Sequence, residues 1–382
     1  MTFGASDPYK ANRHNSFLFF PDTYNKPKHV HQTMQLYEDN TKLVEQFGAD
    51  PITKAKHLPN NKIFTTDTLH SHRGFDKFIQ RLKSGEESAI VSGVNASGTL
   101  HYGHKLVFDI NKYFQDEHGV TIYIPISDDE SYVSDKVSTQ EEGRKNAYSL
   151  AREILGYGFD PEKTVFIIDQ DYPAIYNLAF KLSKRLTLSE IKATYGYKNS
   201  DNPGLIFYPS VQSAHVLLPE EREGITNTLV PIGPDEDSHL RIARDLAHRE
   251  DYAKPNVLHT RFLPGLDGKK MSKSKNNAIF LKDTYKTLKK KVNKCFSGGQ
   301  ETLEKHRELG GNPETDMACQ YLKTFFLNKE ETRELFQAYR DGELLTGEVK
   351  HKLYEAANQH NKAFLNDVNA VSQQDLEKTV LR

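Results

Sequence analysis

Tryptophan is absent from the 382 residues of the chain, and cysteine and methionine are scarce, with two and four residues. Two cysteines are too few for a disulfide framework or for a zinc site built from cysteine ligands. The sequence contains no run of 18 or more apolar residues, so its pattern excludes a transmembrane helix. Residues 1–15 are polar and lack the apolar stretch of a secretory signal. We therefore expect a cytoplasmic protein that makes no use of a membrane.

An excess of charge of either sign is missing as well. The 51 Lys and Arg residues balance 52 Asp and Glu residues, which leaves a formal net charge of −1. The molecule as a whole therefore has no bias toward polyanions, and a nucleic acid would have to be bound by local basic patches. A hydrophobic fraction of 37% and a charged fraction of 27% are ordinary for a globular chain long enough for two or three domains.

Three regions follow one another along the chain. Residues 1–65 are polar, with short amphipathic stretches such as Thr41–Phe47, and we expect an N-terminal extension with a helix or two. Residues 66–281 alternate apolar runs with helical patterns, which predicts βαβ units and a doubly wound, parallel α/β sheet. Residues 282–382 have helical patterns only and predict a helical C-terminal domain.

Individual elements of the middle region can be predicted from runs, caps and glycines. Apolar runs predict strands at Ser88–Ser92, Val120–Ile126, Thr164–Ile168, Leu205–Tyr208 and Thr228–Ile232. Helical spacing of apolar residues predicts a helix over His101–His118, which Gly119 ends. Ser138 and Thr139, with glutamates three residues on, predict the start of a further helix ending near Gly156.

The first chemically informative segment joins the strand at Ser88–Ser92 to the helix at His101–His118. It contains Gly93, Gly98, His101, Gly103 and His104. An open parallel sheet binds nucleotides at such a strand–turn–helix junction, where the helix N-terminus attracts phosphate. Gly103 would let a flat base lie against the helix backbone, and the two histidines, three residues apart, could donate to phosphate oxygens. These histidines could equally be ordinary half-buried side chains, or metal ligands completed by His70 and His72.

The second informative segment is a loop rich in glycine, lysine, serine and asparagine. Its central residues are Lys270, Met271, Ser272, Lys273 and Ser274. Lysine ammonium groups and serine hydroxyls can stabilise a departing pyrophosphate. A solvated basic loop is the plain alternative, although a methionine between the lysines is unusual for one.

The two segments together carry a family resemblance. His101-Tyr102-Gly103-His104 followed by Lys270-Met271-Ser272-Lys273-Ser274 resembles the paired signature of class I aminoacyl-tRNA synthetases. The second motif matches the family pattern at every position, and the first departs from it only at Tyr102, where Ile or Val is usual. The resemblance implies a Rossmann-like fold of the HUP type with ATP chemistry at these segments.

Further segments resemble the tryptophanyl-tRNA synthetases of archaea and eukaryotes, from about Ser88 onward. They are Ser127–Glu130, Gly156–Asp160, Tyr208–Gln212, Pro231–Asp237, Phe296–Gly299, Gly310–Gly311 and Leu345–Glu348. By this resemblance the amino-acid side of the site includes Ser92, Gly93, Glu130, Tyr208, Gln212, Asp235, Glu236 and Asp237. Either Glu130 or Glu236 would hold the substrate ammonium, because a buried cation needs a paired anion.

Three departures from the family fall in the expected amino-acid pocket. Val91 stands where the family often has a tyrosine that binds the indole N–H, Pro125 stands where a glutamine is frequent, and Glu236 replaces another frequent glutamine. A different group must therefore read the indole N–H, or the pocket prefers another side chain. The absence of tryptophan from the chain would let an enzyme that supplies tryptophan be made under starvation; drift is the plain alternative.

The resemblance also implies the reaction and its partners. The amino-acid carboxylate attacks the α-phosphorus of ATP, and the acyl group then passes to tRNA, so positioning and electrostatics carry the rate without a protein nucleophile. Mg²⁺ would travel with ATP, and no fixed metal site is expected. The partners implied are tryptophan, tRNA(Trp) and a second copy of the chain. Lysines between Lys282 and Lys294 could contact the tRNA backbone or form a solvated helix face.

Four alternatives stay open at this point. A tyrosyl-tRNA synthetase is the nearest relative by motif. A nucleotidyltransferase of the same superfamily, such as a pantothenate synthetase, would share the ATP segments but would not need the helical domain. A tRNA-binding relative without activity would not need His101, His104, Lys270 and Lys273. A metalloprotein that uses His70, His72, His101 and His104 is the most distant.

Overall fold

The computed structural model describes residues 41–271 and 276–382. The strands are β1 (Asp50–Pro51), β2 (Leu69–Arg73), β3 (Ser88–Val91), β4 (Val94–Asn95), β5 (Thr121–Ser127), β6 (Thr164–Ile168), β7 (Asn227–Ile232) and β8 (Asn256–Thr260). The helices up to β8 are α2 (Lys62–Thr65), α3 (Phe75–Lys83), α4 (Tyr102–His118), α5 (Asp128–Val133), α6 (Gln140–Gly156), α7 (Ala174–Ser183), α8 (Leu188–Tyr195), α9 (Pro203–Glu223) and α10 (Asp237–Arg249). Those after β8 are α11 (Tyr285–Asn293), α12 (Leu303–Leu309), α13 (Met317–Tyr321), the π-helix η4 (Leu322–Phe326), α14 (Lys329–Arg340), α15 (Thr346–Ala370) and α16 (Gln373–Thr379).

The strands form one sheet whose centre is parallel. β3 pairs with β5 on one side and with β7 on the other, while β6 and β8 flank this core. The parallel strands lie in the order β6-β5-β3-β7-β8. The chain adds β5 and β6 on one side of β3 and then β7 and β8 on its other side, and such a switch point opens a crevice at the carboxyl ends of the strands. β2 runs antiparallel to β8 and carries β1 at the outer edge. The expected doubly wound sheet is confirmed, with an antiparallel addition that the sequence pattern did not predict.

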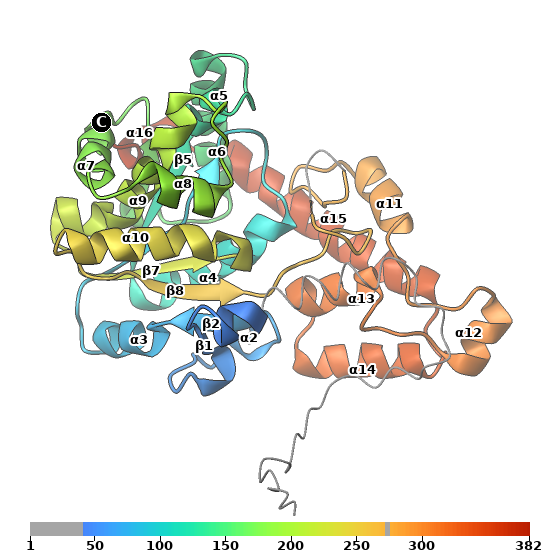
Figure 1. Ribbon diagram of the computed structural model, residues 1–382. Coiled ribbons are helices and arrows are strands. Elements are labelled where there is room, and N and C mark those ends of the chain that lie inside the picture. Colours follow the sequence, from blue (N-terminus) through green and yellow to red (C-terminus); the bar gives the residue numbers. More distant parts are fainter. Residues whose placement is uncertain (1–40, 272–275) are drawn as a thin grey trace, which may run out of the picture.

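Helices cover both faces of the sheet (Figure 1). One face packs Ile90, Ile122 and Ile124 against α4, α6 and α15 in the larger buried cluster. The other face packs Val91 and Tyr123 against α7, α9 and α10. Alternate residues along a strand point to opposite faces, so the strands are apolar on both sides, as parallel strands between two helical layers must be.

The region after β8 is helical, as expected, and it returns to the sheet at its end. The long helix α15 passes from the helical region to α6, where Val368 lies against Gly156 so closely that a side chain at Gly156 would collide with it. After α16, Val380 forms a parallel bridge with Phe166 of β6. The chain end therefore extends the edge of the sheet. The division at residues 65 and 281 stays a prediction.

One predicted strand is wrong. Leu205–Tyr208 lies in the first turns of α9, not in a strand. The run of apolar and aromatic residues resembles a short buried strand, but Asn202 accepts the N–H of Leu205 and Pro203 occupies the first helical position. These are helix-start signals, and they outweigh the β-propensity of the run. The other predicted strands and both predicted helices are confirmed to within a residue or two.

Within the described residues, no helix combines the length and apolar character that crossing a membrane requires.

Candidate active site

The two histidines of the first segment begin α4. His101 is the N-cap, and its Nδ1 accepts the N–H of Gly103 at 3.1 Å. The Nδ1 of His104 accepts the N–H of His101 at 3.1 Å, and the two rings lie 3.9 Å apart. A neutral imidazole that accepts at Nδ1 carries its proton on Nε2. Each ring thus presents an N–H donor at Nε2, beside a helix N-terminus that favours anions.

The two chemical segments, far apart in sequence, meet at this helix start. The N–H of Tyr102 donates to the carbonyl of Ile279 at 3.0 Å, and the N–H of Leu281 donates to the carbonyl of Leu100 at 3.0 Å. A methyl group at Gly103 would lie 3.3 Å from Sδ of Met271. The chain that follows the second segment therefore pairs with the chain that leads into α4.

Lys270 extends this junction toward the end of β7. Its ammonium lies 3.2 Å from the carboxylate of Asp235, and 60% of its side chain is exposed. Its carbonyl accepts from the side-chain amide of Asn277 at 3.1 Å, which closes the base of the loop. The remaining predicted members of the segment, Ser272, Lys273 and Ser274, lie outside the described residues.

Replacing Gly103 with alanine should impair the ATP side of the site. The new methyl group would lie within 2.9 Å of the His101 ring, which would have to move out of its N-cap position. It would also occupy the flat surface expected to receive the base. We expect KM for ATP to rise about tenfold or more, as a misplaced binding group costs in active sites. Steady-state pyrophosphate exchange measures this change.

Gly347 offers the matched control for this substitution. It also lies in the first turn of a helix, α15, but a methyl group there would meet no atom within 4 Å. Gly347→Ala should leave KM for ATP unchanged and raise helix stability by about 0.5–1 kcal/mol. An equal effect of the two substitutions on KM would contradict the role of Gly103.

The amino-acid side of the crevice begins beside β5. Glu130 accepts from the side-chain amide of Asn95 and, at 2.8 Å, from the ammonium of Lys136. The hydroxyl groups of Ser127 and Tyr208 lie 2.8 Å apart, which joins the end of β5 to α9. Gly93 and Ser92 follow β3, where the N–H of Ser92 donates to the carbonyl of Tyr123. The structure therefore brings the predicted residues of β3, α5 and α9 to one edge of the sheet.

An aromatic stack lines this edge, and the sequence analysis missed it. Tyr195 stacks on His239 with ring centroids 4.2 Å apart, and on Tyr197 at 5.5 Å. The hydroxyl of Tyr195 donates to Gln212 at 2.8 Å, and Nδ1 of His239 lies 2.9 Å from Glu236. Burial, and then the nearby charge of Glu130, raise the pKa of Tyr197 to about 12. The Tyr-Gly-Tyr sequence at the end of α8 was the available signal, because Gly196 ends the helix in a left-handed turn.

Asp237 lies under the site and not at its surface. Only 1% of its side chain is exposed, and its carboxylate accepts from Arg73 at 2.8 and 2.9 Å and from His259 at 2.9 Å. Burial would raise the pKa of Asp237, but the hydrogen bonds and charges of His259 and Arg73 prevail and hold it well below its usual range. Asp237, which was predicted to bind substrate, instead links β2 to α10 by an ion pair. Its neighbour Glu236 is 47% exposed and lies beside the aromatic stack.

A buried acidic cluster lies next to the pocket. Carboxylate oxygens of Asp128, Asp129 and Asp169 lie within 4.8 Å of one another. Oδ1 of Asp169 is 2.6 Å from Nε2 of His215, and Asp128 accepts from the side-chain amide of Gln170 at 2.6 Å. Burial raises the pKa of both Asp129 and Asp169, and the charge of Asp169 raises that of Asp129 further. The absence of a fixed metal stays a prediction.

The four-histidine metal site is wrong. Among the described residues, the carboxylate trio is the one group of metal-ligand side chains close enough to share an ion. His70 and His72 lie on the antiparallel strand β2, where His70 bonds to Ser71. His101 and His104 have their Nδ1 atoms engaged by the backbone of α4.

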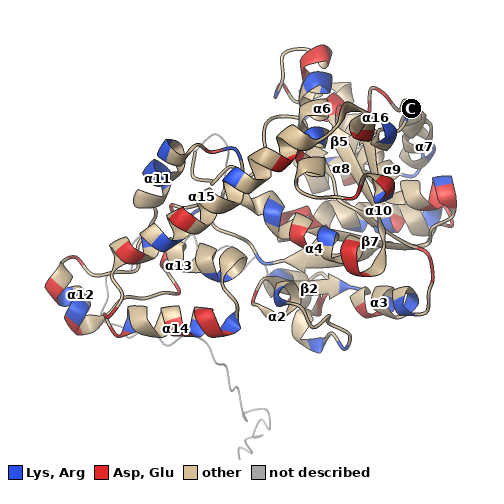
Figure 2. Cartoon of the chain, turned by 180° about the vertical axis from the view of Figure 1, so that it is seen from behind, with Lys and Arg blue, Asp and Glu red and all other residues tan. Residues whose placement is uncertain are grey.

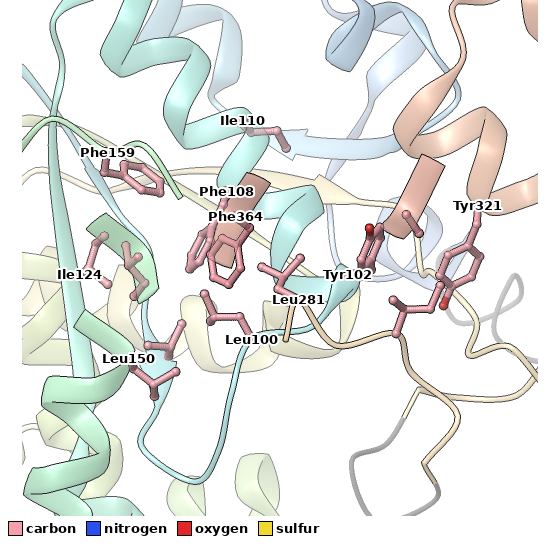
Figure 3. Packing of buried hydrophobic residues seen from close by; sticks show 14 of the residues in the cluster. Leu100, Tyr102, Phe108, Ile110, Ile124, Leu150, Phe159, Leu281, Tyr321 and Phe364 are labelled. Atoms are coloured by element: carbon pink, nitrogen blue, oxygen red, sulfur yellow. The ribbon is translucent and has the colours of Figure 1, made fainter. Parts of the chain in front are cut away.

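Tyr102, which departs from the family motif, lies in the hydrophobic cluster, on the side of Leu281 and Tyr321 (Figure 3). It is fully buried, its ring centroid lies 5.1 Å from that of Phe325, and its hydroxyl lies 3.3 Å from Oδ1 of Asn361 on α15. Leu281 and Tyr321 pack beside it. The larger side chain therefore joins the start of α4 to the helical region and leaves the ATP side of the motif unchanged.

Comparisons with known proteins identify the family of the chain. The model of the class I tRNA synthetase family (W and Y) matches residues 83–362. A relative from Methanocaldococcus jannaschii is 37% identical over 359 residues, which cover 90% of this chain and 94% of the relative. One from Sulfurisphaera tokodaii is 36% identical over 334 residues, covering 84% and 86%.

Solved structures give the same result. A tryptophanyl-tRNA synthetase from Aeropyrum pernix K1 superposes with a TM-score of 0.83 at 27% identity, covering 90% of this chain and 96% of that one. One from Giardia lamblia has a TM-score of 0.82 at 29% identity, covering 94% and 98%. The chain belongs to the class I tRNA synthetases of the W and Y family, which use ATP. Both relatives described above bear the name tryptophan–tRNA ligase.

Proposed function

We propose that the chain is a tryptophan–tRNA ligase, which activates tryptophan with ATP and transfers it to tRNA(Trp). The observation that carries this proposal is the junction of the two ATP segments at the start of α4, where Met271 lies against Gly103. The similarity to tryptophan–tRNA ligases over most of the chain supports tryptophan as the amino acid. A tyrosyl-tRNA synthetase has no such support among these relatives.

The ATP side of the site works by position and charge. His101 and His104 donate from Nε2 to phosphate oxygens, because their Nδ1 atoms are held by backbone N–H groups. Gly103 leaves room for the base. Lys270 moves from Asp235 to the departing pyrophosphate. By the family motif, Ser272, Lys273 and Ser274 supply further donors to the same group. Mg²⁺ would arrive with ATP and would supply positive charge to the phosphates, since Mg²⁺ takes most of its ligands from water and phosphate oxygens and not from a protein cage.

The amino-acid side supplies the anion for the substrate ammonium. Glu130 has only 12% of its side chain exposed, and it forms an ion pair with Lys136, whose side chain is 44% exposed. Glu236 is more exposed and is bonded to His239. Glu130 is the better buried of the two and is therefore our choice for the ammonium, because an ion pair strengthens as water is excluded.

The tRNA backbone meets the outer face of α11. Figure 2 shows Lys and Arg positions, in blue, along the backbone of this helix. A cavity of about 550 Å³ between α11 and the base of the second segment is lined by Lys286, Lys290 and Lys294. Lys291 is excluded from this role, because its ammonium is buried against Asp283 at 2.7 Å. The helical region carries the anticodon contacts, and a second copy of the chain completes the functional dimer.

Charging of unfractionated tRNA tests the proposal. Incubation with ATP, Mg²⁺ and either tryptophan or tyrosine should produce acylated tRNA with tryptophan alone, visible as a shift on an acid gel. The acylated species should hybridise with a tRNA(Trp) probe. Charging with tyrosine, or charging of another tRNA, would refute the proposed substrate while leaving the family assignment intact.

A further inference from the structure

The amino-acid pocket needs a hydrogen-bond acceptor for the indole N–H, and the two positions expected to provide it hold apolar residues. Val91 ends β3 and Pro125 lies on β5. Val91 packs with Tyr123 in the cluster under α9, and Pro125, two residues beyond Tyr123, points to the same face of the sheet. Neither side chain can accept a hydrogen bond. An indole N–H is a donor only, so its partner must be an acceptor on this face or on the helix above it.

α9 lies over this face and carries three polar residues at helical spacing. Tyr208, Gln212 and His215 are four and three residues apart, so they share one side of the helix. The hydroxyl of Tyr208 is paired with Ser127, and Oε1 of Gln212 already accepts from Tyr195. His215 is the member of the set whose hydrogen-bond partner is a carboxylate.

The bond to Asp169 fixes how His215 is protonated. Nε2 of His215 lies 2.6 Å from Oδ1 of Asp169, and both side chains are almost wholly buried. Asp129 is the donor and Asp169 the acceptor of the proton that the two carboxyl groups share. Asp169 therefore accepts from Nε2 of His215, and the imidazole keeps its lone pair on Nδ1. Burial lowers the pKa of His215 to about 4, so the ring is neutral at pH 7. Among the described residues, no donor reaches Nδ1 of His215.

Asp129 is the hydrogen-bond partner of the second carboxylate oxygen of Asp169. Oδ2 of Asp169 is buried and finds no donor among the described residues other than a protonated neighbour. Asp129 lies in the same carboxylate cluster, and burial together with repulsion from Asp169 keeps a proton on the pair at neutral pH. Two carboxylates this close cannot both ionise. The shared proton leaves Asp169 able to accept from His215, as the tautomer requires.

We propose that Nδ1 of His215, held in its acceptor tautomer by Asp169, reads the ring N–H of the amino-acid substrate in place of the residues expected at Val91 and Pro125. This inference rests on the proposed function, since it takes tryptophan as the substrate. His215 touches the substrate, and Asp169 is a positioning residue. The pair would reject a ring of the same shape that lacks the N–H, because His215 would be left without a partner.

Substrate discrimination tests the proposal. Tryptophan and 3-(benzothiophen-3-yl)alanine have nearly the same shape, but sulfur replaces the N–H. In pyrophosphate exchange, the native enzyme should prefer tryptophan in kcat/KM by about tenfold or more. His215→Leu should bring this ratio close to one, by lowering the value for tryptophan and not that for the analogue. The ratio does not depend on how much of the variant is folded.

Two further variants separate recognition of the indole N–H from a general effect on the stability of the protein. Asp169→Asn should raise KM for tryptophan about tenfold with little change in kcat or in KM for ATP, because it disturbs the tautomer. Tyr123→Phe removes another side-chain hydrogen bond on the same sheet face, from Tyr123 to Glu223, and should leave the ratio unchanged. A His215→Leu enzyme that keeps the native ratio would overturn the inference alone. A native enzyme that activates an amino acid other than tryptophan would overturn the proposed function and this inference together.

Discussion

Lys270→Ala should lower the rate of adenylate formation by about a hundredfold to a thousandfold, the usual loss when one group that stabilises the transition-state charge is removed. Lys270 is held near the crevice by Asp235 at 3.2 Å, yet its side chain is largely exposed and can follow a leaving pyrophosphate. Its ion-pair partner Asp235 is not a member of the aromatic stack of Tyr195, Tyr197 and His239. Binding of tryptophan should therefore stay nearly intact, as measured by equilibrium dialysis beside single-turnover adenylate formation.

Lys269→Ala is the control for this loss. Lys269 precedes Lys270, and its backbone, not its side chain, makes the bonds that shape the turn, to Gly265 and Asp267. The Lys269→Ala variant should form the adenylate at a rate within a few-fold of the native rate. Amino-acid-dependent exchange at the native rate in Lys270→Ala would remove this lysine from the mechanism.

Asp237→Asn should lower the free energy of unfolding by about 3–5 kcal/mol, the cost of removing one partner from a buried ion pair. The carboxylate of Asp237 accepts hydrogen bonds from Arg73 and His259 and forms an ion pair with Arg241 at 3.2 Å. The amide would leave Arg73, whose side chain is 9% exposed, without a counter-charge. Denaturant unfolding followed by circular dichroism measures the loss.

The pH dependence of this loss has a definite sign. The folded pKa of Asp237 lies below its ordinary value, so its contribution is complete above an unfolded pKa of about 3.9 and declines as the pH falls below it. The difference in stability between the native chain and Asp237→Asn should therefore be constant from pH 7 to pH 5 and narrow toward pH 3. Asp245→Asn, on the exposed side of α10, should cost less than about 0.5 kcal/mol. A difference that widens in acid would contradict the ion-pair account.

The ATP side of the site was predictable from the sequence because its signals are local. A strand, a glycine turn and a helix start fix where His101 and His104 lie, and Gly119 fixes where α4 ends. The meeting of Met271 with Gly103 was not predictable from spacing, since it depends on how the chain returns from β8. The family resemblance supplied that link before the structure did.

The amino-acid side was less predictable, because tertiary contacts decide the role of each polar residue. Asp237 and Glu236 are neighbours in sequence, but the strand β2, which the sequence did not predict, pairs Asp237 with Arg73 in the interior. His215 and Asp169 carried no signal in the sequence, since their pairing joins α9 to the end of β6. Leu205–Tyr208 was misread because its apolar run hid a helix start at Asn202.

Pyrophosphate exchange with each of the twenty amino acids, one at a time, tests the central claim most directly. The account predicts ATP–pyrophosphate exchange that depends on tryptophan and is weak or absent with the other nineteen. Exchange stimulated by tyrosine and not by tryptophan would contradict it.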